Sequence, residues 1–308
     1  MMPNTARLLT TNTAYLLDEA RIKYVAIGWQ ALDTIGEEKT PGEVDMAILD
    51  GQIADAIKHL VTAGFDQPCN RPNCAELKID RGDPVIKERE LARARELRPE
   101  LGSKPVLNPE SGYAGHCWAY ARWHGIAEAH FHINGADYLL SLHRKSQTLW
   151  WMSDEEFGIT KEDLAIANAP GSENPHPHLI LSTDAERIPP RGEPYNGSGP
   201  WGTLYAVKIL NPDSFTDAVL FLLCRYLNHE EHLDKMCLNM IACLKDKSPN
   251  RLKKNVRPEF KHLWDAFNGR ANSKVLPLVA AKYARSYLAG RNELGPLPLP
   301  PVREEGLD

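Results

Sequence analysis

The sequence lacks long apolar runs and is poor in cysteine. Its longest apolar segment, AVLFLLC at 218–224, is far shorter than the roughly 20 residues that a membrane-spanning helix needs. The N-terminal residues do not form the continuous apolar stretch of a signal peptide. The six cysteines are scattered, mostly in apolar or helical contexts, which is typical of reduced thiols in a cytosolic protein. We therefore expect a cytoplasmic protein with no membrane partner.

An excess of positive charge is also missing. The chain has 36 Lys and Arg against 41 Asp and Glu, a formal net charge of −5. A broad surface for nucleic acid or anionic lipid needs the opposite balance, so we expect a small-molecule substrate and no nucleic acid. Hydrophobic residues make up 43% of the 308 residues, enough for a large core. The oligomeric state stays open.

The order of the expected elements predicts an α/β (α+β) fold, with a mixed sheet, flanking helices and a helical C-terminal part. Gly64 is expected to end a helix, and Asn211 and Asp213 are N-cap candidates for another. Hydrophobic periodicity predicts helices at 6–21, 29–38, 52–63, 212–228, 230–246, 256–268 and 273–290. It predicts strands at 23–28, 43–49, 74–80, 129–133, 138–144, 148–152, 178–184 and 204–210.

This pattern divides the chain into three expected parts. Residues 1–210 form the α/β domain, with an inserted hairpin region in its second half. Residues 211–290 form a helical subdomain. Residues 291–308 are a proline-rich tail that we expect to be extended.

Two carboxylates stand at the start of the second expected strand. Alternation along a strand places Glu43 and Asp45 on one face, where they repel each other and call for a counter-charge such as a divalent cation. Gly28 ends the preceding strand at a turn into a helix, where a backbone can approach a phosphate. The pattern favours metal-dependent phosphoryl or nucleotidyl transfer. The alternative is a solvated face on an edge strand without a function.

These residues resemble the motif of the nucleotidyltransferase-fold (polymerase-beta-like) superfamily. That motif is a hydrophobic residue, glycine and a small residue, then nine to thirteen residues, then acid-hydrophobic-acid-hydrophobic. Here IGW at 27–29 is followed by EVDM at 43–46. Trp29 takes the place of the second small residue, so the motif is partly degenerate. Together with the segment from 204 onward, which turns from the last strand into helices, it resembles uncharacterised fungal members, often encoded among secondary-metabolism genes.

The resemblance implies roles for individual residues. Glu43 and Asp45 would hold Mg²⁺ for transfer of a nucleoside monophosphate from an NTP to a small-molecule or protein acceptor. Asp80 would be the third carboxylate or a base. Lys39 stands where members of the family often carry an arginine. The residues implied to contact the nucleotide are Gly28, Trp29 and Lys39.

Two other functions remain open beside nucleotidyl transfer. The scaffold could have lost NTP chemistry and serve as a fungal secondary-metabolism enzyme or a small-molecule-binding protein. It could also be a non-catalytic interaction protein that uses its helical part and proline-rich tail.

Histidines gather in the expected strands. His130 and His132 share a strand face and could chelate a metal with His143 from the neighbouring strand, act as general acid or base, or simply be half-buried and hydrogen-bonded. His176 and His178 are likewise two residues apart.

Two further clusters have both a functional and a purely structural interpretation. A zinc site could combine Cys69 and Cys74 with His116 and Cys117, although inert buried thiols are the simpler interpretation. The aromatic residues of 112–125, with the tryptophans at 150 and 151, could line a pocket or form ordinary core.

Overall fold

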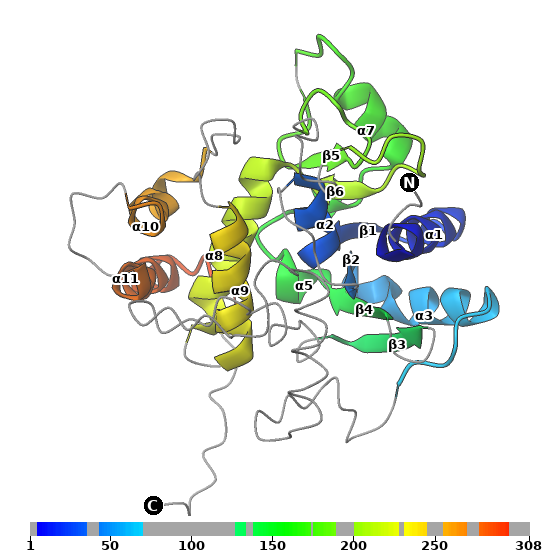
Figure 1. Cartoon of the computed structure of the whole chain (residues 1–308), viewed down its shortest axis with the longest axis horizontal. Coiled ribbons are helices and arrows are strands. Elements are labelled where there is room, and N and C mark those ends of the chain that lie inside the picture. Colours follow the sequence, from blue (N-terminus) through cyan, green and yellow to red (C-terminus); the bar gives the residue numbers. More distant parts are fainter. Residues whose placement is uncertain are drawn as a thin grey trace, which may run out of the picture.

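The computed structural model describes a mixed α/β protein with a six-stranded mixed sheet and flanking helices (Figure 1). After β6, every element in the described part of the chain is helical. The structure describes residues 5–35, 43–69, 127–133, 138–173, 175–188, 200–227, 231–244, 255–269 and 277–295.

The helices and strands alternate up to β2, and the remaining strands come from later segments. The strands are β1 Tyr24–Ile27, β2 Glu43–Ile48, β3 Ala129–Ile133, β4 Tyr138–Arg144, β5 Leu179–Leu181 and β6 Lys208–Leu210. The α-helices are α1 Thr5–Glu19, α2 Gly28–Ile35, α3 Ile53–Thr62, α5 Lys145–Thr148, α6 Asp154–Phe157, α7 Lys161–Ala167, α8 Pro212–Tyr226, α9 Glu231–Leu244, α10 Lys261–Phe267 and α11 Pro277–Gly290, with 3₁₀ turns η1 Asp50–Gln52 and η5 Pro258–Phe260.

The strand order, β3-β4-β2-β1-β6-β5, places β2 inside the sheet. β1 pairs with β2 antiparallel, which sets Ile27 opposite Asp45. β2 pairs with β4 parallel, which sets Asp45 beside Ser141. All six residues of β2 are buried. The alternative of a solvated edge-strand face for the acid pair is therefore wrong.

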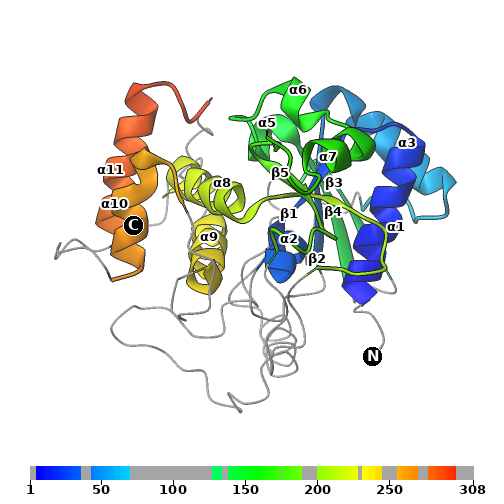
Figure 2. The same ribbon diagram turned by 90° about the horizontal axis from the view of Figure 1, so that it is seen from above.

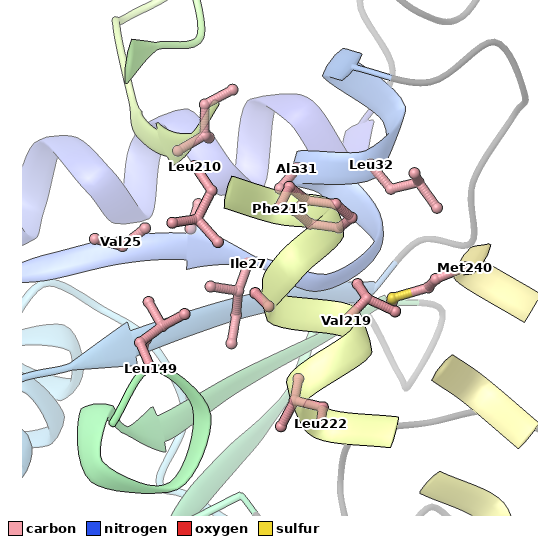
Figure 3. Packing of buried hydrophobic residues seen from close by; sticks show 14 of the residues in the cluster. Val25, Ile27, Ala31, Leu32, Leu149, Leu210, Phe215, Val219, Leu222 and Met240 are labelled. Atoms are coloured by element: carbon pink, nitrogen blue, oxygen red, sulfur yellow. The ribbon is translucent and has the colours of Figure 1, made fainter. Parts of the chain in front are cut away.

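Helices cover both faces of the sheet. On one face, Phe215 and Val219 of α8 pack against Ile27 and Leu210 (Figure 3). On the other, α1 and α3 lie side by side, and Tyr24 donates a hydrogen bond to Asp18 in α1 (3.0 Å; Figure 2). β1 can be apolar on both faces because both faces are covered.

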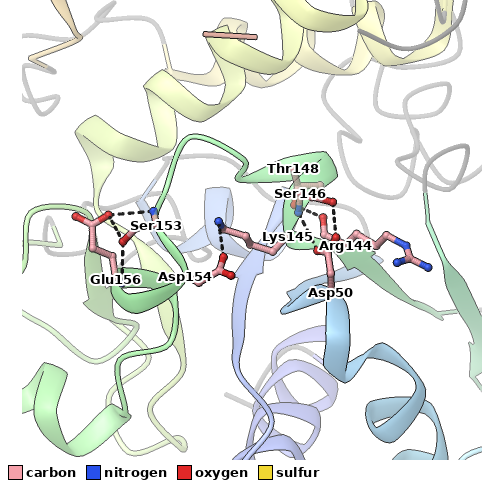
Figure 4. A network of polar contacts seen from close by, with 8 residues as sticks. All are labelled: Asp50, Arg144, Lys145, Ser146, Thr148, Ser153, Asp154 and Glu156. Carbon is pink, nitrogen blue, oxygen red and sulfur yellow. Dashed lines mark hydrogen bonds and ion pairs between the residues drawn. The ribbon is translucent and has the colours of Figure 1, made fainter. Parts of the chain in front are cut away.

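A polar corner fixes the end of β4 to the end of β2 (Figure 4). Asp50 accepts hydrogen bonds from the backbone N–H of Ser146 at 3.0 Å and from its hydroxyl at 2.5 Å. Lys145 lies 2.8 Å from Asp154 at the start of α6, beyond a turn. These contacts hold the parallel pair in register at the end opposite to the acids.

Most expected elements are confirmed, with ends within a few residues, and the strands at 129–133 and 138–144 agree at both ends. The strand expected at 148–152 is wrong: residues 145–148 form α5 and a turn follows. Helices α6 and α7 were not predicted. The strand at 74–80 lies outside the described residues, and the domain limits stay predictions. Within the described chain, no helix is both long and apolar enough to span a membrane.

Candidate functional site

The acid pair and the glycine turn come together as the sequence predicts. Gly28 begins α2 directly after β1, with a positive φ of 67° that favours glycine. A Cβ atom at this position would collide with the carboxylate of Asp45. The glycine is therefore required where α2 starts against β2, because it leaves the space that the Asp45 side chain occupies.

Asp45 is held by a histidine from the neighbouring strand. His143 Nε2 lies 3.0 Å from Asp45 Oδ1, and both side chains are buried. The second oxygen, Oδ2, is also buried, and none of the described residues donates a hydrogen bond to it. Glu43 lies on the same face two residues earlier and is only 3% exposed. The face thus buries two acids, and one carboxylate oxygen of Asp45 accepts no hydrogen bond from the described residues.

The polar face continues across three strands. Asp45 pairs with Ser141, and Ser141 pairs with His130 in β3, so these three residues form one row. Glu43 and His132 occupy the two ends of the next row. Adjacent strands are about 4.8 Å apart, which puts the two ends of a row roughly 10 Å apart. Glu43, Asp45, Ser141, His143, His130 and His132 therefore share one face.

At the β3 end of this face, the two histidines meet a cysteine. Donor atoms of Cys69, His130 and His132 all lie within 4.8 Å of one another. The two imidazole rings are 5.2 Å apart. Burial lowers the pKa of His130, and the neighbouring His132 lowers it further. The thiol and the two imidazoles of this trio are soft and borderline metal donors, whereas the acid pair offers only carboxylate oxygens.

Not every predicted site residue lies on this face. Lys39 and Asp80 lie outside the described residues, so their roles stay predictions. Trp29 is completely buried and belongs to the hydrophobic core, and a contact with a nucleotide stays a prediction. His143, which on one of the alternatives would complete a metal site with the two β3 histidines, lies 3.0 Å from Asp45.

Of the other residues that the sequence singled out, some lie outside the described residues and the rest have structural contacts. Cys74, His116, Cys117 and the aromatic residues of 112–125 lie outside the described part. Trp150 and Trp151 pack against Phe221 of α8, at centroid distances of 5.7 and 5.9 Å, which agrees with the core interpretation. His176 Nδ1 accepts hydrogen bonds from the backbone N–H groups of residues 178 and 179, a structural role.

Sequence reasoning missed the partners of the acid pair, Ser141 and His143, because it could not show that β2 and β4 are parallel neighbours. The alternation in YLLSLHR at 138–144 does place these two residues on one face of their strand. Sequence reasoning also grouped Cys69 with other cysteines and missed its place beside the β3 histidines. The contact between Cys69 and β3 joins segments that are about sixty residues apart.

Comparisons with protein-family models, with curated proteins and with solved structures found no match to this chain. The functional assignment below therefore depends on the site itself.

Proposed function

We propose that this protein is a nucleotidyltransferase-like transferase, which moves a nucleoside monophosphate from an NTP to a small-molecule or protein acceptor. The observation that carries the proposal is the meeting of Gly28, Glu43 and Asp45 on one face of the sheet. The antiparallel β1–β2 pair joined by α2 supports a nucleotidyltransferase-like arrangement.

The residues fit a bound Mg²⁺ ion. Asp45 Oδ2 is buried and has no donor among the described residues, and Glu43 adds a second carboxylate to the same face. Carboxylate oxygens are the protein ligands that Mg²⁺ prefers. When bound, Mg²⁺ would neutralise phosphate charge and activate the acceptor hydroxyl or amine.

The other residues of the site have supporting roles. His143 orients the Asp45 carboxylate through the 3.0 Å contact to Oδ1, which leaves Oδ2 for the cation. The N-terminal end of α2, beginning at Gly28, offers backbone N–H groups and a partial positive charge to an anionic phosphate. Lys39 and Asp80 are proposed to add a positive charge and a third carboxylate.

Binding of a nucleotide with Mg²⁺ tests this proposal directly. Isothermal titration of the full chain should show saturable NTP binding that requires Mg²⁺. Asp45→Asn and Glu43→Gln should each weaken it more than about tenfold, because each removes one charged cation ligand. Asp55→Asn is the matched control, since Asp55 is exposed in the first turn of α3. Absence of saturable binding at millimolar NTP would refute the proposal.

The His143–Asp45 contact favours a second candidate. A buried imidazole oriented by a carboxylate is the arrangement of a general base. On this alternative, the protein is a biosynthetic enzyme of fungal secondary metabolism, acting on a metabolite without NTP. Glu43→Gln separates the two candidates: it should abolish nucleotidyl transfer but spare acid–base chemistry, whereas His143→Gln should abolish acid–base chemistry.

A further inference from the structure

We propose that Cys69, His130 and His132 bind one zinc ion at the edge of the sheet, separate from the acid pair. The three donor atoms already lie within 4.8 Å of one another. Tetrahedral zinc with ligand distances of about 2.0–2.3 Å requires donors roughly 3.3–3.8 Å apart. Side-chain adjustments of about 1 Å would therefore bring the donors to zinc-binding distance.

The segment that leads to Cys69 is fixed in place by the end of α3 and by packing against β3. α3 ends in a Schellman motif, in which Gly64 has a φ of 105° and the N–H of Phe65 donates to the carbonyl of Leu60 (3.1 Å). Phe65 then packs edge-on against Phe131 of β3, at 6.0 Å between ring centroids. The segment after α3 is thereby fixed to the edge strand before it reaches Cys69.

Cys69 itself joins the edge of β3. Its backbone N–H donates a hydrogen bond to the carbonyl of His130 at 2.8 Å. Phe131 and the two histidines alternate along β3, so the phenyl ring and the imidazoles point to opposite faces. The segment 64–69 therefore wraps around the edge, with Phe65 on one face and the Cys69 thiol beside the imidazoles on the other.

The donor chemistry selects zinc over the magnesium proposed for the acid pair. A thiolate and two imidazoles suit Zn²⁺, whereas Mg²⁺ prefers oxygen ligands. Cys69 is a free cysteine, and its thiol lies beside the two imidazoles. Zinc would fasten the segment after α3 to β3.

Zinc titration of the metal-stripped full chain tests the inference. We expect one Zn²⁺ per chain and a higher melting temperature with zinc than without it, because the ion binds only the folded site. Replacing zinc by Co²⁺ should give a thiolate-to-cobalt absorption band. Cys69→Ser should remove that band, and both Cys69→Ser and His132→Ala should weaken zinc binding more than about tenfold.

Two controls match these variants. Cys243→Ala removes a buried cysteine of α9, and His262→Ala removes an exposed histidine of α10. Both should keep the affinity of the unmodified chain. Circular dichroism without metal checks that each variant is folded, and His132, which is only half-buried, provides a second test if Cys69→Ser does not fold.

Less than one zinc per chain, or unchanged affinity in both Cys69→Ser and His132→Ala, would overturn the inference. The result is independent of the proposed transferase function. Glu43→Gln should lose Mg²⁺-dependent NTP binding and keep zinc, so the two proposals can fail separately.

Discussion

At the scale of single residues, Gly28 is a position where the packing of the protein itself requires a glycine. Its positive φ costs a residue with a side chain about 1–2 kcal/mol, and a Cβ would also displace the Asp45 carboxylate. We predict that Gly28→Ala lowers the free energy of unfolding by more than about 2 kcal/mol, measured by urea denaturation.

Substitutions at two other glycines distinguish backbone strain from the clash with Asp45 as causes of this loss of stability. Gly64 has a φ of 105° but open space around an added Cβ, so Gly64→Ala should cost only the backbone strain of about 1–2 kcal/mol. Gly51 has open space and no positive φ, so Gly51→Ala should be near neutral. If Gly28→Ala and Gly64→Ala cost the same, the contact with Asp45 carries no energy.

At the scale of elements, α1 is attached to α2 by a buried ion pair. Arg7 donates from Nε to Asp33 Oδ2 at 2.7 Å, and the two residues are 5% and 1% exposed. Removing one partner of a buried pair leaves an uncompensated charge and costs about 3–5 kcal/mol. We predict this loss for Arg7→Met in urea denaturation, against a negligible change for Lys58→Met on the exposed side of α3.

A double-mutant cycle completes that test. Arg7→Met with Asp33→Leu removes both charges and should recover part of the loss. If the double variant is no more stable than Arg7→Met alone, the loss of stability in Arg7→Met does not come from breaking the ion pair with Asp33.

A carboxyl group links α8 to the chain that leads into α10. Asp217 accepts a hydrogen bond from the backbone N–H of Arg257 at 3.0 Å. Burial raises the pKa of Asp217 from its ordinary 3.8 to about 7, although the hydrogen bond and charge of Arg257 oppose this shift. Near pH 5 to 6 the folded protein therefore holds a proton that the unfolded chain has released.

The sign of the resulting pH dependence follows from linkage. The contribution of Asp217 to stability is fully present below about pH 4 and is lost as the pH rises to about 7. Asp217→Asn stays neutral and keeps an acceptor oxygen, so its stability relative to the unmodified chain should rise across this window. Urea denaturation between pH 4 and 8 measures the difference.

The elements themselves were largely predictable because their signals are local. Asn211 does cap α8, accepting from the N–H of Ser214, and Gly64 does end α3. The apolar run at 148–152 was misread because a short apolar run fits a strand and a buried turn equally well. Its tryptophans are partly buried and pack against Phe221 of α8, which is about seventy residues away in the sequence.

The candidate site was predictable only within one strand. Alternation placed Glu43 and Asp45 on one face, and the glycine turn placed Gly28 near them. The rest of the site depends on which strands are neighbours: β2 meets β4, which brings His143 to Asp45, and β3 lies next to Cys69. Strand neighbours separated by long connections are set by tertiary packing, which no local pattern encodes.

At the scale of the whole molecule, one hydrophobic core connects the sheet with the C-terminal helices. The buried cluster includes residues of the sheet, of α8 and α9, and of α10 and α11. The cluster contains residues on both sides of position 211, where the sequence-based division falls. We therefore expect the α/β part and the helical part to unfold together in a single cooperative transition, although the chain is large enough for two domains.

Phe221 is the residue on which that coupling can be tested. Its ring lies 4.7 Å from that of Phe260 and packs on both Trp150 and Trp151, so it joins α8 to both sides of the core. Phe221→Ala should cost about 3–5 kcal/mol. Because the core is continuous, circular dichroism and tryptophan fluorescence should still report one shared, lowered melting temperature. Two separate transitions in the unmodified chain would show that the helical part is an independent domain and would contradict this prediction.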